Sequence, residues 1–200
     1  MTDIATRPDP SQDIRDYYAK WYRPDLQGIV IVGDIDVDAV EAKLKAVFAD
    51  VQKAVNPAER VYYPVADNKE PIVAIGTDKE VDDPSIEVYF KQDATPDSEK
   101  NNVGYLASQY MTSMITSMLN ARLSELTQSA NPPFNRAYSS YGNFFVAKTK
   151  EALNLSASSK ANGIEEALKV LLQEAERARR FGFTESEYAR ARANYLQRLE

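Results

Sequence analysis

Residues 138–158, YSSYGNFFVAKTKEALNLSAS, contain two neighbouring segments with β-strand character. In the second segment, apolar residues such as Leu153 and Leu155 alternate with polar ones, which is typical of a strand with one buried face. Two such segments in succession predict an antiparallel hairpin whose strands cover residues 138–146 and 152–158.

Apolar residues with helical spacing flank the hairpin on both sides. Before the hairpin, a long helix is expected to open at Thr95-Pro96, because a hydroxyl can cap the first turn and proline loses no hydrogen bond there. After the hairpin, a helix is expected to begin near Asn162 and to end at Gly182, which suits a left-handed C-cap. The sequence Thr-Glu-Ser-Glu at 184–187 is a capping box and predicts the start of a last helix.

The N-terminal third contains one expected helix at residues 13–22, which is ended by the proline that follows it. The β-branched run at 29–32 predicts a strand that is buried on both faces. Asp36 is a suitable N-cap for a helix after that strand. Two further strands are expected at residues 72–76 and 86–91.

Strands in hairpin order, with helices grouped apart from them, predict an α+β fold class. We expect an antiparallel-rich sheet with helices packed mainly on one face. An unpaired edge of such a sheet would leave backbone donors and acceptors without partners. We therefore hypothesise that Gly28–Asp34 completes the sheet in the isolated chain.

The composition excludes several classes of protein. The net charge is −6, with 24 basic and 30 acidic residues, which argues against a nucleic-acid partner. No apolar run is long enough to span a membrane, and the polar N-terminus does not resemble a signal peptide. The acidic, cysteine-free composition is compatible with bacterial cytoplasm or periplasm and argues against a membrane location.

The sequence contains neither histidine nor cysteine. This absence removes Ser-His-Asp catalysis, histidine zinc motifs and thiolate chemistry, so we expect the chain alone to be inactive. The acidic pair Asp34 and Asp36 has two interpretations. It could bind Mg²⁺ in a small stand-alone enzyme. Alternatively it forms a turn and a helix N-cap, which the lack of a glycine-rich phosphate loop favours.

Three parts of the chain carry a resemblance to one protein family. The first is YYAKWYRPD at 17–25 followed by IVIVGDID at 29–36. The second is ARLSEL at 121–126 followed by RAYSSY at 136–141, and the third is EYARAR at 187–192. Together, and in this order, they resemble the pitrilysin/insulinase-type zinc metallopeptidases, relatives of the mitochondrial processing peptidase.

The resemblance implies a place in a larger protein. In that family, each half of a clamshell contains two related α/β domains, and an inverted H-x-x-E-H motif in the first domain holds zinc. The chain is similar to the non-catalytic C-terminal domain of such a half. Residues 1–53 would then be a lead-in and the final β-α unit of the preceding peptidase domain, 54–71 a linker, and 72–200 the non-catalytic domain. No cofactor is expected in this chain, and zinc is expected in the preceding domain of the parent protein.

The resemblance also implies substrate-binding residues. The family uses an arginine and a tyrosine to bind the substrate carbonyl, and Tyr138 matches the tyrosine. Thr127 stands where the arginine is expected, which argues against a direct catalytic role, and Arg136 is a candidate to supply the charge instead. Tyr141 is a further candidate contact in the chamber wall. No metal ligand can be assigned.

Two functions follow from this resemblance. In the first, the chain is a non-catalytic domain of a zinc-dependent metalloendopeptidase that lines the chamber, helps to bind unfolded peptide and contacts the other domains of its parent. In the alternative, it is a structural assembly subunit, similar to the inactive core relatives in respiratory complexes, and has no peptidase role.

Overall fold

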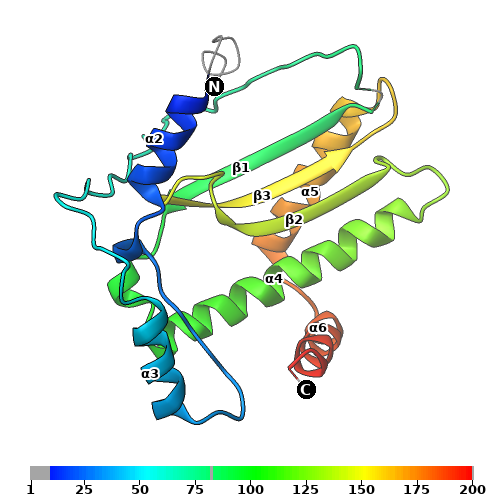
Figure 1. Cartoon of the computed structure of the whole chain (residues 1–200). Coiled ribbons are helices and arrows are strands. Elements are labelled where there is room, and N and C mark those ends of the chain that lie inside the picture. The colour runs from blue at the N-terminus through cyan, green and yellow to red at the C-terminus, as the bar shows by residue number, and fades with distance from the viewer. Residues whose placement is uncertain (1–9, 82, 200) are drawn as a thin grey trace. The chain divides into compact units, whose positions relative to one another are not determined.

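The computed structural model of the chain describes residues 10–81 and 83–199. It separates into two compact units, Met1–Val61 and Tyr62–Glu200, called unit 1 and unit 2 below (Figure 1). The boundary between the units lies inside the predicted linker, 54–71. The predicted domain limits themselves stay a prediction, and the first nine residues of the predicted lead-in lie outside the described residues.

Unit 1 consists of short elements joined by irregular chain. Helix α2 (Ser11–Trp21) is followed by a 3₁₀ turn, η1 (Pro24–Leu26), and then by helix α3 (Val37–Val47). The helix expected at residues 13–22 is confirmed. The Asp36 N-cap of α3 is also confirmed, because its carboxylate accepts a hydrogen bond at 3.0 Å from the backbone N–H three residues later.

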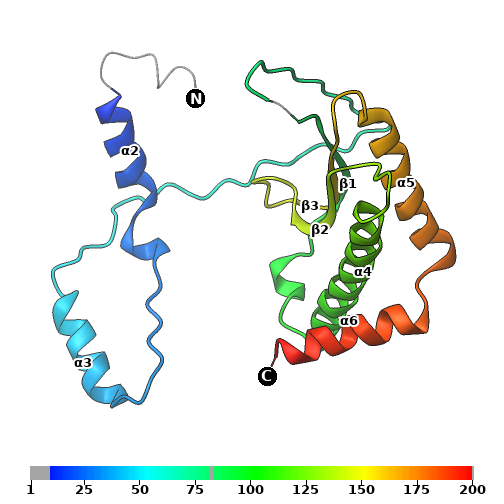
Figure 2. The ribbon, with the colours of Figure 1, turned by 90° about the vertical axis from the view of Figure 1, so that its right-hand side faces the viewer.

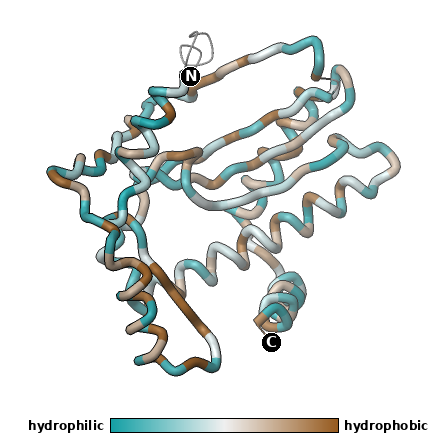
Figure 3. Tube along the Cα trace, viewed as in Figure 1, coloured by the Kyte–Doolittle hydropathy of each residue, from teal (hydrophilic) through white to brown (hydrophobic). Residues whose placement is uncertain are grey.

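The strand predicted at residues 29–32 is wrong. These residues have no regular secondary structure, and Val30 and Val32 are 86% and 91% exposed. They form a continuous apolar stretch of chain before α3 (Figure 3). β-Branched residues favour an extended backbone, but a strand also needs a neighbour that pairs with its N–H and C=O groups. Among the described residues, no strand pairs with 29–32.

The strand predicted at 72–76 is wrong for the same reason, and its apolar residues Ile72, Val73 and Ile75 are exposed. The hypothesis that Gly28–Asp34 completes the sheet is wrong as well. The sheet has three strands among the described residues, and none of them includes this segment.

Unit 2 contains all the strands of the described chain and the longest helices. Its elements are β1 (Ser85–Asp93), η2 (Asp97–Glu99), α4 (Val103–Thr127), β2 (Arg136–Asn143), β3 (Lys150–Ser158), α5 (Ile164–Phe181) and α6 (Glu185–Gln197). The strand expected at 86–91, the hairpin and the two helices after it are therefore confirmed.

The sheet has the order β1-β3-β2, and both pairings are antiparallel. Helices α4 and α5 lie on one side of it (Figure 2). Leu155 in the central strand β3 is level with Val88 of β1 and Ser139 of β2. The predicted α+β class, with an antiparallel sheet and helices mainly on one face, is confirmed.

Helix α4 begins at Val103 and not at Thr95, where the sequence pattern placed its start. Pro96 instead precedes the short 3₁₀ turn η2. The Asn102 side chain accepts a hydrogen bond from Tyr105 N at 2.9 Å and so provides the N-cap. Asn102 therefore satisfies the first turn of α4, seven residues after the hydroxyl at position 95 that the sequence pattern favours as the cap.

The core of unit 2 lies between the sheet and its helices. Leu123 of α4, Leu155 of β3 and Leu171 of α5 are almost completely buried in one cluster. A second cluster joins Met114 and Met118 of α4 to α6. These contacts hold α4 and α5 against one face of the sheet and α6 against α4. None of the helices in residues 10–81 and 83–199 combines the length and the apolar character of a membrane span.

Candidate functional site

The two faces of the sheet differ in what covers them. Side chains alternate between the faces of a strand, so Leu155 and its odd-numbered neighbours in β3 point toward α4 and α5. In the part of unit 2 that the structure describes, no helix covers the other side of the sheet, called the helix-free face below (Figure 2). By the same alternation and the register, this face carries Tyr89, Lys91, Arg136, Tyr138 and Asn154.

The predicted contact residues are divided between the two faces. Arg136 and Tyr138 stand on the helix-free face, where both are exposed, Tyr138 by 43%. Tyr141, an odd-numbered residue of the same strand, points to the opposite face. The structure therefore brings Arg136 and Tyr138 to one surface and does not place Tyr141 with them.

Tyr141 belongs to a short chain of hydrogen bonds at one end of the sheet. Its hydroxyl donates to Glu151 Oε2 at 2.7 Å and accepts a hydrogen bond from the Gln92 amide. Partial burial, followed by the hydrogen bond to Glu151, raises the pKa of Tyr141 to about 12. The phenol therefore keeps its proton at neutral pH and acts as a donor. Sequence reasoning missed Glu151 and Gln92, because three strands bring them together.

Aromatic rings cover part of the helix-free face. Phe144 packs edge-on against Tyr89, with ring centroids 5.5 Å apart, and Phe145 contacts both rings. The Tyr89 hydroxyl donates to Glu87 at 2.5 Å, and this bond raises the pKa of Tyr89 to about 12. In the middle of the face, Asn154 has a buried Oδ1 for which the described residues supply no hydrogen-bond partner. The face thus combines aromatic surface with polar groups.

A segment without regular structure is attached to the end of the sheet. Lys150 Nζ lies 2.6 Å from a carboxylate oxygen of Asp67 and 2.6 Å from one of Asp93. Lys91 Nζ also donates to the Ala66 carbonyl at 3.0 Å. The two carboxylates raise the pKa of Lys150. These contacts fasten residues 66–67 beside the helix-free face.

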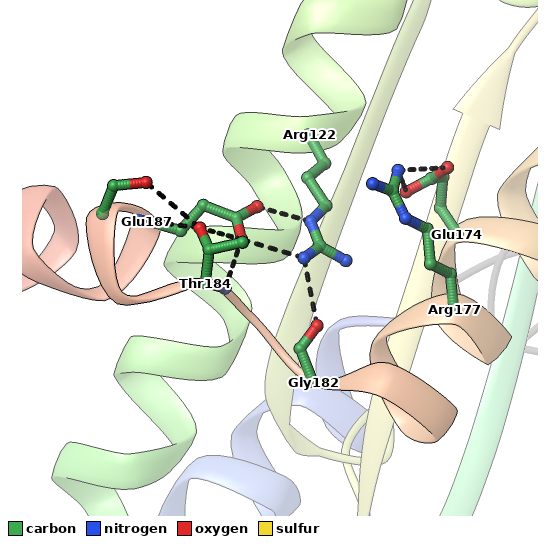
Figure 4. Close-up of polar contacts among 7 residues, drawn as sticks. Arg122, Glu174, Arg177, Gly182, Thr184 and Glu187 are labelled. Atoms are coloured by element: carbon green, nitrogen blue, oxygen red, sulfur yellow. Dashed lines mark hydrogen bonds and ion pairs between the residues drawn. The ribbon is translucent and has the colours of Figure 1, made fainter.

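Arg122 of α4 is a buried arginine, 8% exposed, that forms a bidentate ion pair (Figure 4). Arg122 Nε donates to Glu187 Oε1 at 2.5 Å, and Nη2 donates to Glu187 Oε2 at 2.9 Å and to the Gly182 carbonyl at 3.0 Å. Its guanidinium also lies 4.5 Å from the ring centre of Phe183. Arg122 thereby ties α4 to the α5–α6 connection.

Glu187 serves two structures at once. Its Oε2 also accepts from the backbone N–H of Thr184 at 2.7 Å and from the Thr184 hydroxyl at 2.9 Å, which confirms the predicted capping box. The hydrogen bond from Arg122 is the largest cause that lowers the pKa of Glu187 to about 2. The predicted C-cap is confirmed too, since Gly182 has φ +67°. Arg122, Gly182 and Glu187 thus hold α4, the end of α5 and the start of α6 together. The sequence pattern did not predict the pairing of Arg122 with Glu187.

The described residues do not form a metal site. Residues 10–81 and 83–199 contain no group of three or more His, Cys, Asp or Glu side chains that could hold a metal ion. Asp36, one half of the acidic pair considered for Mg²⁺, is engaged as the N-cap of α3. The N-cap interpretation of this pair therefore accounts for Asp36.

Comparison with protein families gives a match over nearly the whole chain. Residues 10–195 match the family described as the peptidase M16 inactive domain. The chain belongs to the peptidase M16 family. The resemblance to the insulinase-type peptidases is thereby confirmed, and the M16 match is to the inactive domain of that family. No curated protein sequence matches the chain significantly.

Solved structures agree with the M16 fold. The periplasmic protease PqqL from Escherichia coli superposes with a TM-score of 0.72 at 21% identity, covering 100% of this chain and 21% of that one. A structure of the first half of PqqL gives a TM-score of 0.71 at 21% identity, covering 100% of this chain and 41% of that one. A predicted insulinase family protease from Yersinia pestis gives 0.67 at 14% identity, covering 97% and 41%. The M16 chain thus spans less than half the length of these structures.

Proposed function

We propose that the chain is a non-catalytic domain of a larger zinc-dependent metalloendopeptidase, in which it lines the chamber and helps to bind unfolded peptide. The observation that carries this proposal is the outer edge of β2, the last strand in the sheet order, with which no further strand pairs among the described residues. A peptide can add to such an edge through main-chain hydrogen bonds, which give affinity without requiring a particular sequence.

Arg136 and Tyr138 are the side chains proposed to contact the peptide, because both are exposed on β2. Tyrosine offers a broad apolar ring and a hydroxyl, and arginine offers several donors, so both suit varied peptide sequences. Tyr141 has its hydroxyl engaged by Glu151 and Gln92. Its proposed contribution is therefore through its backbone at the edge of β2, with the side chain holding β2 and β3 in place.

The zinc ion belongs, in this proposal, to the preceding domain of the parent protein. The sequence has no histidine, and the described residues contain no cluster that fits a metal. The other domains of the parent are then the direct partners. The exposed apolar stretches at 29–32 and 72–75 favour this, because exposed contiguous apolar surface is typical of an interaction site.

Fluorescence anisotropy with a reduced, alkylated and fluorescein-labelled polypeptide tests the peptide-binding part. We expect saturable binding without cleavage, and weaker binding by Tyr138→Ala. Tyr17→Ala is the matched control, since Tyr17 is an exposed tyrosine of α2 in unit 1. Equal affinity of Tyr138→Ala and the parent chain would remove Tyr138 from the site, and absence of binding would refute the proposal.

The exposed stretches at 29–32 and 72–75 also favour a second candidate, a structural assembly subunit without a peptidase role. The sequence that precedes the chain in its parent protein separates the two. An H-x-x-E-H motif with a later glutamate supports the peptidase domain. Its absence, together with stable binding to a partner subunit, supports the assembly subunit.

A further inference from the structure

A side chain of α4 occupies part of the edge of β2. The backbone N–H of Ser139 donates to Asn120 Oδ1 at 2.5 Å. Asn120 Nδ2 in turn donates to the Ser139 carbonyl oxygen at 2.9 Å. One carboxamide therefore satisfies both backbone groups of a residue in the middle of the strand.

These two backbone groups lie on the outer edge of β2. Phe144 N donates to Lys150 O, in the same register as the strands, so even-numbered residues of β2 bond to β3. The odd-numbered residues Ala137, Ser139 and Tyr141 then direct their N–H and C=O groups away from β3. Among the described residues, no strand lies on that side.

The Asn120 carboxamide makes the contact that a neighbouring strand would make. In an antiparallel pair, a partner residue accepts from the N–H and donates to the C=O of the residue opposite. A carboxamide offers the same donor and acceptor as a peptide group. Asn120 reaches this position because α4 runs alongside β2 (Figure 1). Its Oδ1 also lies 3.1 Å from the Ser139 hydroxyl, which donates to it.

We propose that Asn120 is a removable plug in the strand-addition site of β2, displaced by the main chain of an extended, unfolded peptide. This inference rests on the proposed function and names the contact that regulates it. A peptide can pair with Ala137 and Tyr141, for whose edge groups the described residues supply no partner. Pairing at Ser139 requires that Asn120 leave. The plug protects a sheet edge from unwanted strands and lowers the affinity for peptides that must displace it.

Asn120→Ala removes the plug and leaves the strand sequence unchanged. With a short fluorescein-labelled peptide of alternating Thr and Val flanked by Lys, we expect about tenfold tighter binding than the parent chain, because two competing hydrogen bonds are gone. Thr116→Ala is the matched control one turn earlier. Its hydroxyl bonds to carbonyl oxygens of its own helix, at 2.9 and 3.2 Å. The substitution keeps the Thr116 backbone carbonyl, which accepts from the Ser139 hydroxyl at 3.4 Å, so we expect unchanged affinity.

Amide hydrogen exchange shows whether the peptide adds to the edge. Bound peptide should slow exchange at Ala137 and Tyr141, whose N–H groups face outward, whereas the Ser139 N–H only changes its acceptor from Asn120 to the peptide. It should leave Tyr138 and Ser140 unchanged, because their N–H groups already bond to β3. The same peptide with N-methyl groups on alternate residues should not bind, since it cannot complete the ladder.

The outcomes separate the plug from the proposed function. Equal affinity of the Asn120→Ala and parent chains, with alternating protection in β2, would overturn the plug and leave the peptide-binding function standing. No binding by either chain would overturn both. Self-association of Asn120→Ala in place of peptide binding would overturn the peptide as the occupant of this edge.

A measurement on the unchanged chain covers the case in which Asn120→Ala does not fold. The side-chain NH₂ of Asn120 should exchange slowly with solvent in the absence of peptide and faster at saturating peptide. Unchanged exchange of this NH₂ group on saturation, with the peptide bound, would overturn the plug.

Discussion

Unit 1 and unit 2 differ in what their apolar residues contact. In unit 2, Leu123, Leu155 and Leu171 are buried between helices and sheet. In residues 10–61, no apolar side chain is buried, and the one buried residue is Arg23, which bonds to the Ala58 carbonyl at 3.0 Å. The comparison shows that apolar patterning alone does not build a stable unit. A second apolar surface within reach is also required.

Amide hydrogen exchange should give the largest difference between the units. We expect residues 153–157 to be protected by several orders of magnitude relative to residues 29–32, because only the former lie in a paired central strand. Exchange followed by mass spectrometry or NMR measures this difference. Slow exchange at 29–32 would contradict this difference between the units and would indicate a paired strand at these residues.

Leu155→Ala should destabilise unit 2 by about 2–5 kcal/mol, because it leaves a cavity in a fully buried position. Val30→Ala in unit 1 should change the free energy of unfolding by no more than about 0.5 kcal/mol, since the side chain is exposed. Urea unfolding followed by circular dichroism measures both. A similar loss from the two substitutions would mean that unit 1 has a core of its own.

Glu187→Gln should destabilise unit 2 by about 2 kcal/mol, because buried Arg122 loses its charged partner. Glu176→Gln is the control. Glu176 is likewise paired with arginine, in its case Arg179 and Arg180, but on the exposed face of α5. Its substitution should therefore lower the free energy of unfolding by less. Equal effects from the two substitutions would show that burial does not strengthen the Arg122 pair.

The same carboxylate makes unit 2 sensitive to acid. The pKa of Glu187 is lowered from 4.5 to about 2 in the folded chain, so the unfolded state binds a proton first as the pH falls. The stability that Glu187 contributes is therefore complete above about pH 4.5 and is lost as the pH falls toward 2. Glu187→Gln should lack this part of the acid sensitivity. An identical pH profile for both chains would argue against the assignment.

Asp36→Ala should have the smallest effect, about 1 kcal/mol on the formation of α3, because it removes one N-cap hydrogen bond. Unit 2 should keep its unfolding transition, since α3 contains no buried residue. Far-ultraviolet circular dichroism at low urea measures the loss of helix, with Asp34→Ala as the control. A shift in the unit 2 transition would show that the units are coupled.

Local signals in the sequence predicted much of unit 2. The alternation around Leu153 and Leu155 defined β3, and the Thr184–Glu187 capping box defined the start of α6. The C-cap preference of glycine predicts the end of α5 at Gly182, where the structure has it. Each of these features depends on residues within a few positions of one another, so a single sequence contains the information.

The wrong predictions concern features that depend on distant partners. The run at 29–32 has strand propensity, but these residues alone do not determine whether a neighbouring strand pairs with them. The pattern predicts the wrong start for α4 because Thr95 and Asn102 are both suitable N-caps, and the helix uses only the second.

The candidate site was predictable only in part. A family resemblance singled out Arg136, Tyr138 and Tyr141, and alternation alone could have separated Tyr141 from the other two. The Asn120–Ser139 contact joins a helix to a strand edge, and the Arg122–Glu187 pair spans 65 positions. Pairings of this kind follow from tertiary packing, and no local pattern predicts them.

The central place of β3 has a consequence for the order of folding. Its pairing with β2 closes a short connection, whereas its pairing with β1 must enclose the whole of α4 and β2. Closing the larger loop costs more chain entropy, and non-local strand pairs form more slowly than hairpins. The β2–β3 hairpin should therefore form early and β1 should join late. Until β1 joins, the edge of β3 that it later covers is open to the strands of other chains.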